Sequence, residues 1–147
     1  MTRTDKALEL FSSNFNCSQA VLAAFAKDFG MDEELALRIA TAFGGGARNG
    51  EMCGAVSGAL LVLGLKYGHY DSADNAQKSR AYEIASDFTN RFKATNGSIV
   101  CRELLGYDLS KSEGMAIIKE KGLFGSVCPQ MVKSAAEILE GILADYE

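Results

Sequence analysis

Four cysteines are the residues of this chain best suited to redox or metal chemistry. They are widely separated, and no two of them form a Cys-x-x-Cys pair: Cys17, Cys53, Cys101 and Cys128. This spacing excludes zinc ribbons, thioredoxin-like motifs and ferredoxin runs, all of which need short gaps between their cysteines. Any site that uses several of these cysteines must therefore be assembled by the tertiary fold.

Each cysteine is predicted to lie in the first turn of a helix. Cys53 begins a helix after a glycine-rich loop, and the other three follow predicted N-caps at Asn16, Ser98 and Ser126. A helix N-terminus carries roughly +0.5 charge and lowers the pKa of a nearby thiol. Four converging ends would supply about +2, which nearly balances four thiolates on a dipositive metal or cluster. We therefore expect the four sulfurs to lie close together.

These cysteines are compatible with three uses. All four could act as metal ligands, either to an iron–sulfur cluster or to a zinc or iron ion. They could instead be redox thiols that form two pairs and cycle with disulfides. In the third use no cofactor is present, and the cysteines pack as small hydrophobic residues. The two redox uses require an electron donor or acceptor, which the sequence does not identify.

A glycine-rich loop, Gly44-Gly-Gly-Ala-Arg-Asn-Gly50, directly precedes the Cys53 helix. Its N–H groups could bind an anion or a cluster sulfide, with Arg48 adding positive charge. The loop lacks the lysine and the Ser/Thr of a P-loop, so a plain connection is the alternative. The candidates for cofactor binding are Gly45, Gly46, Arg48 and Gly54.

Two other ionisable residues are candidates for a catalytic role. Glu51 could accept a proton beside Cys53, although a carboxylate in a first helical turn is also favourable capping. The single histidine, His69, lies past the far end of the same helix, roughly 24 Å from Cys53 at the usual helical rise. We expect it at the surface, so a Cys-His hydrolase has little support.

The elements that must position the cysteines are predicted to be helices throughout. The sequence predicts an all-α, compact single domain over residues 1–147, with about seven helices around a central helix at about 51–67 that is apolar all round. Gly54 and Gly58 leave one side of this helix without bulk, which predicts close approach of a neighbouring backbone.

The central segment also carries a family resemblance. Cys53-Gly-Ala-Val-Ser-Gly58 has the form C-G-A-x-x-G, with one cysteine before it and two after it. In this motif, in the order of its cysteines and in its length, the chain resembles the C_GCAxxG_C_C family of redox-active proteins. The resemblance implies a small cytoplasmic protein with a redox role, in a family whose genes tend to lie near transporter genes. The alternative is an accessory or binding protein, a homodimer associated with a transporter, with its cysteines in the core.

Composition narrows the remaining classes of partner. The net charge is −4, and the 15 Lys and Arg residues are scattered, which argues against nucleic acid as a partner. The longest uncharged stretch, 52–65, is shorter than the roughly 20 residues of a membrane span, so we expect no membrane insertion. The charged N-terminal residues predict no secretory signal and therefore a cytoplasmic protein.

Overall fold

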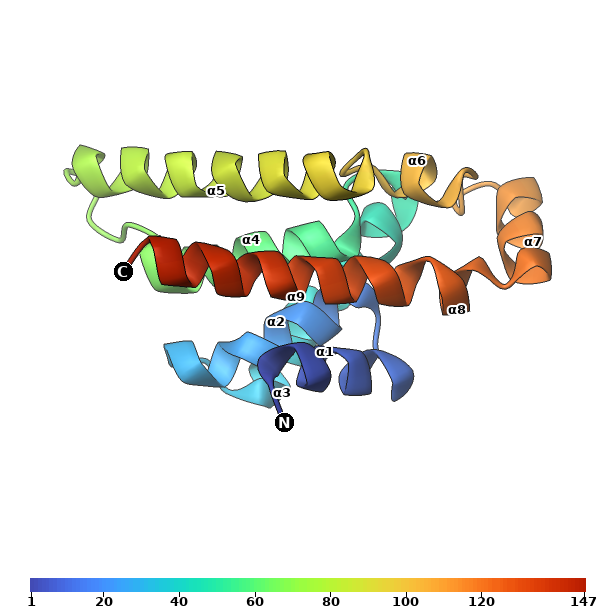
Figure 1. The fold of residues 1–147 in the computed structure, drawn as a ribbon, viewed down its shortest axis with the longest axis horizontal. Coiled ribbons are helices and arrows are strands. Elements are labelled where there is room, and N and C mark those ends of the chain that lie inside the picture. The colour runs from blue at the N-terminus through green and yellow to red at the C-terminus, as the bar shows by residue number, and fades with distance from the viewer.

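A computed structural model describes all residues from 1 to 147 and shows an α-helical protein with no β-strand (Figure 1). The helices are α1 Arg3–Ser12, α2 Cys17–Ala26, α3 Glu33–Ala40, α4 Gly54–Tyr67, α5 Asn75–Asn96, α6 Cys101–Leu105, α7 Ser112–Lys121, α8 Leu123–Ser126 and α9 Cys128–Asp145. The predicted all-α class is confirmed. There are nine helices where about seven were predicted; two of the nine, α6 and α8, have only five and four residues.

The main hydrophobic core is built around α4, which packs against α2, α5 and α9. Twenty-seven buried residues form this core, and nine of the fourteen residues of α4 are buried. An apolar helix with no polar face is stable only when neighbours cover it on every side. The predicted central helix is therefore confirmed, although it begins at Gly54 rather than near residue 51.

The glycines of α4 allow the backbone of α2 to come close. A Cβ atom at Gly58 would lie 2.7 Å from the carbonyl oxygen of Ser18, and one at Gly54 would lie 3.1 Å from its amide nitrogen. The first separation is shorter than real Cβ contacts and the second is tighter than most of them, so the predicted close approach is confirmed. The same contact brings the first turn of α2, which holds Cys17, against the first turn of α4.

A second, much smaller hydrophobic cluster lies beyond the end of the main core. It consists of four buried residues, Cys101, Leu105, Leu109 and Ile118. We call residues 101–126, which contain α6, α7 and α8, the cap segment. In Figure 1 the cap segment connects one end of α5 to the start of α9, at the right of the view. Val127 and Cys128, where α9 begins, pack against both clusters.

Two features of the surface and of the helices bear on partners and location. His69 is exposed, as predicted. No helix combines the length and the apolar character needed to cross a lipid bilayer.

Candidate functional site

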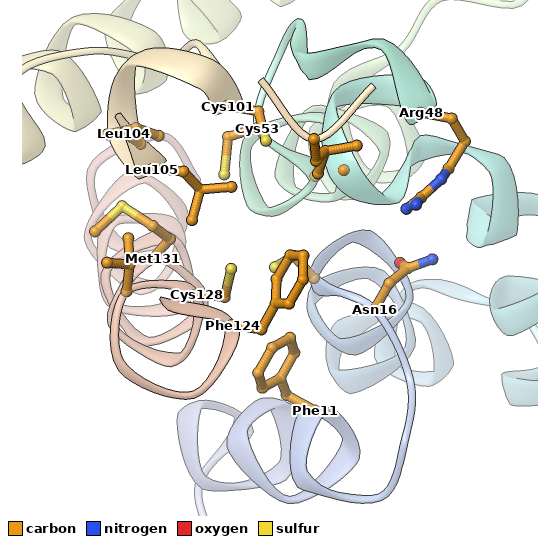
Figure 2. A pocket seen from close by; sticks show the side chains of 15 residues that line it. Phe11, Asn16, Arg48, Cys53, Cys101, Leu104, Leu105, Phe124, Cys128 and Met131 are labelled. Carbon is orange, nitrogen blue, oxygen red and sulfur yellow. The ribbon is translucent and has the colours of Figure 1, made fainter. Parts of the chain in front are cut away.

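All four cysteines line one cavity, which has a volume of about 220 Å³ and lies where the main core meets the cap segment (Figure 2). The cavity wall is largely apolar. Beside the cysteines it contains Phe11, Leu104, Leu105, Leu109, Phe124, Val127 and Met131, together with Asn16, Gly45, Arg48 and Gly54. The fold therefore gathers onto one cavity four cysteines that are far apart in the sequence.

Cys17 and Cys53 are brought together by the crossing of α2 and α4. Asn16 caps α2, and its side chain accepts a hydrogen bond from the Gln19 amide while the Gln19 side chain accepts one from the Asn16 amide. This confirms the predicted capping box and fixes Cys17 as the first residue of α2. Cys53 is the N-cap of α4, and a Cβ atom at Gly54 would lie 3.3 Å from the Cβ of Cys17.

Cys101 is brought beside Cys53 by a short antiparallel bridge between Met52 and Val100. The Cys53 amide donates a hydrogen bond to the Ile99 carbonyl at 2.7 Å, and the Cys101 amide donates one to the Glu51 carbonyl. Pairing of these two extended segments puts the starts of α4 and α6 side by side. This contact was not predicted, because the sequence shows no alternating strand pattern there.

Cys128 approaches the cavity from the opposite side. Figure 2 shows Cys53 and Cys101 above the cavity and Cys128 below it, on the first turn of α9. Cys128 is partly exposed, whereas the other three cysteines are buried. It is therefore the least buried of the four cysteine residues.

Two of the predicted N-caps are wrong. Helix α6 begins at Cys101 with Val100 as its N-cap, while the Ser98 hydroxyl accepts a hydrogen bond from the Val100 amide just before it. Ser126 is the last residue of α8, and its hydroxyl donates to the Gly122 carbonyl. In both places the serine bonds to backbone outside the helix that it was expected to cap, a common competing use of this side chain.

Burial is the largest influence on the thiol pKa at two of the cysteines, and it raises the pKa, contrary to the expected effect of helix N-termini. It raises the pKa of Cys53 to about 11 and that of Cys101 to about 12. The amides of Ala55 and Val56 lower the pKa of Cys53, but neither makes a full cap hydrogen bond. Desolvation in the apolar cavity therefore outweighs the helix dipole at these two thiols.

Cys17 and Cys128 behave as a coupled pair. Their mutual interaction raises the pKa of Cys17 and lowers that of Cys128, and burial raises the pKa of Cys17 further. A negative charge on any of the other three cysteines also raises the pKa of Cys17. In the metal-free protein Cys128 is thus the thiol of this pair that loses its proton first.

Three of the four candidate cofactor-binding residues belong to the cavity wall, two from the glycine-rich loop and one from the start of α4. Gly45, Arg48 and Gly54 line the cavity, but Gly46 does not. Gly46 is buried against the backbone of Glu51, where an added Cβ would collide, so its role is to allow the turn. The guanidinium of Arg48 donates to the Gly44 carbonyl at 3.2 Å, and its positive charge lowers the pKa of Cys101.

Glu51 does not serve as a proton acceptor for the cavity in this structure. Its carboxylate is exposed and pairs with Arg102 at 2.9 Å, and Glu51 is not among the residues of the cavity wall. The pair instead strengthens the contact between the segments that precede α4 and α6.

The cysteines converge, but less tightly than expected. All four are free thiols, and no three metal-binding side chains lie close enough together to hold a single metal ion. A tetrahedral zinc site has Zn–S bonds of about 2.3 Å and needs its sulfurs nearly in contact. As they stand, the four thiols line one cavity without forming such a site.

The apolar part of the cavity wall was not predicted as part of the site. Leu104 and Leu105 follow Cys101 by three and four positions, and Met131 follows Cys128 by three, so each shares a helix face with its cysteine. The helical spacing from the cysteines could therefore have identified these three residues from the sequence. Phe11 and Phe124 carry no such signal, because tertiary packing alone places them there.

Comparison with known proteins identifies the family. Residues 15–142 match the model of the family described as "Putative redox-active protein (C_GCAxxG_C_C)". The chain belongs to this family, and the match includes all four cysteines of the cavity. Neither a search of curated proteins nor a search of solved structures found a match.

Proposed function

We propose that this protein transfers single electrons through an iron–sulfur cluster held in the cavity by Cys17, Cys53, Cys101 and Cys128. The observation that carries the proposal is the set of four thiols, from the starts of four helices, around one cavity. No histidine, aspartate or glutamate lines that cavity. A donor set made only of thiols is the usual one for iron–sulfur clusters.

The spacing of the thiols supports a cluster over a single zinc or iron ion. Three side chains cannot reach one ion as they stand, whereas a cluster spreads its ligands around several iron atoms. Such a cluster would supply reversible one-electron chemistry. The proposed partners are therefore a one-electron donor and a one-electron acceptor, both in the cytoplasm.

The residues of the cavity have definable roles in this function. The buried thiols of Cys53 and Cys101 are protonated near neutral pH, so binding of the cluster would release their protons. The aromatic and leucine side chains of the wall keep water from the site, which strengthens electrostatic interactions inside it. Exposure of Cys128 gives the site its nearest approach to solvent and so to a redox partner.

A second candidate is two-electron exchange by Cys17 and Cys128. Its support is the coupled thiol pair, with one pKa lowered and the other raised. The Cys128 thiolate would attack a disulfide substrate and release one thiol. Cys17 would then attack the mixed disulfide, forming the Cys17–Cys128 disulfide and releasing the second thiol. This chemistry leaves Cys53 and Cys101 without a role, which is why the cluster is preferred.

The test is to purify the protein without oxygen and to measure iron, sulfide and visible absorption. We expect a coloured protein that contains iron and sulfide. Replacement of any one cysteine by serine should remove most of the colour, and adding Cys128→Ser to Cys53→Ser should remove little more, because residues that act as one unit are lost together. Ser126→Ala, at an exposed position close to Cys128, should keep its iron.

Colourless protein with four titratable thiols and no iron would reject the cluster. In that case oxidised glutathione decides between the remaining alternatives. Loss of two thiols, with a disulfide between Cys17 and Cys128, would favour dithiol exchange. Retention of all four thiols would favour the accessory protein, in which the cysteines pack the core.

A further inference from the structure

Arg48 is the one charged side chain among the fifteen residues that line the cavity. In Figure 2 it extends from the glycine-rich loop toward the cavity, on the side of Cys53 and Asn16. Arg48 as a whole is exposed, but its Nη1 makes a partly buried hydrogen bond beside the cavity, so solvent screens its charge only in part. Burial raises the pKa of Cys101 overall, and the positive charge of Arg48 opposes that rise, so the charge of Arg48 reaches this thiol.

The backbone at Arg48 adopts a conformation that arginine disfavours. Residues 45 to 48 have consecutive positive φ angles of 66°, 63°, 56° and 64°. Glycine accepts this left-handed region freely, and the first two residues are Gly45 and Gly46. Ala47 and Arg48 are strained there. Backbone strain of this kind often occurs at functional sites, and at position 48 a glycine would avoid it.

The space that the arginine occupies is provided by a neighbouring glycine. A Cβ atom at Gly45 would lie 2.6 Å from Nη1 of Arg48 and 2.9 Å from Cδ2 of Leu109. Nη1 also donates a hydrogen bond to the Gly44 carbonyl at 3.2 Å. The guanidinium is therefore held in place between its own loop and the cavity wall.

From the lone charge, the strained backbone and the space beside Gly45, we infer that Arg48 sets the reduction potential of the redox group in this cavity. The inference rests on the proposed function. Reduction adds one electron, and hence one negative charge, without making or breaking a bond in the protein. A fixed positive charge stabilises the reduced state more than the oxidised state, and so Arg48 raises the potential.

The test compares four variants of the protein purified without oxygen. Midpoint potentials are measured by titration with dithionite and redox mediators, with visible absorption as the signal. Arg48→Gln removes the charge and should lower the potential, whereas Arg48→Lys keeps a charge and should stay closer to the wild-type value. Ala47→Gly relieves the neighbouring strain without a change of charge. Arg102→Gln removes a nearby charge that does not line the cavity, and both controls should change the potential little.

An Arg48→Gln potential equal to that of the wild type would overturn the inference and leave the cluster intact. An equal shift in Ala47→Gly would also overturn it, because the loop conformation and not the charge would then be the cause.

A second measurement decides the inference if the wild-type protein carries no chromophore and the proposed function fails. Reduced, iron-free protein is alkylated with iodoacetate, which is negatively charged, and with iodoacetamide, which is neutral. If the charge of Arg48 acts in the cavity, the ratio of the iodoacetate rate to the iodoacetamide rate at Cys128 should fall several-fold in Arg48→Gln and stay near the wild-type value in Arg48→Lys. An unchanged ratio in Arg48→Gln would by itself show that the charge of Arg48 does not act in the cavity, and the inference would be rejected.

Discussion

The main core and the cap segment differ greatly in size, and the candidate site lies between them. The main core contains 27 buried residues, whereas the cluster of the cap segment contains four. Cys17 and Cys53 belong to the large cluster, Cys101 belongs to the small one, and Cys128 packs against both. The four cysteines therefore connect a part of the molecule with extensive apolar burial to a part with little apolar burial.

The difference in buried residues predicts a difference in rigidity between the two sides of the site. Buried apolar area is the main favourable term in folding, so the main core should hold its cysteines rigidly. The cap segment has few buried residues and should open at a lower free energy. A group bound to all four cysteines would then stabilise the cap segment more than the main core.

The largest expected effect comes from removing an aromatic ring in each region. Phe88 is fully buried and stacks on Phe92 in the main core, whereas Phe124 is only half-buried in the cap segment. Phe88→Ala should cost about 3–5 kcal/mol of unfolding free energy. Phe124→Ala should cost clearly less, and urea denaturation measures both. Equal losses would mean that the two regions fold as one uniformly packed unit.

The second expected effect tests the close contact between α2 and α4. Gly58→Ala puts a Cβ 2.7 Å from the Ser18 carbonyl oxygen and should destabilise the protein by roughly 1–3 kcal/mol. Gly64→Ala, on the same helix with no atom within 4 Å, should stabilise it by up to about 1 kcal/mol. In thermal melts, the melting temperatures of the two variants should shift in opposite directions. A stable Gly58→Ala protein would argue against the close crossing that positions Cys17 and Cys53.

The third effect concerns opening of the cap segment, measured by hydrogen exchange with mass spectrometry. Amides of α6 and α7 should exchange faster than those of α2 and α4, since they cover fewer buried residues. Reconstitution with iron and sulfide should slow exchange in α6 by about tenfold or more, equivalent to about 1.4 kcal/mol of stabilisation. Protection confined to α2 and α4 would place the bound group away from Cys101.

The smallest effect is expected in the loop that precedes α4. Ala47 has a φ of 56°, so Ala47→Gly should relieve strain and raise the unfolding free energy by about 1 kcal/mol. Ala116 is exposed in α7, and Ala116→Gly should lower it by a similar amount. Thermal melts measure both variants. A shift of the melting temperature in the same direction for both would contradict the left-handed conformation of the loop.

Local patterns in the sequence were sufficient to predict most of the helices, including the most buried one. The uninterrupted apolar run after Cys53 predicted a helix enclosed by others, since exposing it on any side would be unfavourable. Asn16 with Gln19 predicted the start of α2, because both halves of a capping box lie within four residues. The two serine caps failed because a serine hydroxyl has several backbone partners within reach and the sequence does not rank them.

The sequence by itself determined which atoms are available for chemistry: four thiols, one arginine beside them in a glycine-rich loop, and helices that bury the positions around them. Only the tertiary structure decided what surrounds those atoms. The Met52–Val100 bridge placed Cys101 beside Cys53, and the cap segment closed an apolar wall over them. This wall reversed the expected direction of the thiol pKa values at Cys53 and Cys101, because desolvation depends on neighbours from distant parts of the chain, whereas a helix dipole acts within one turn.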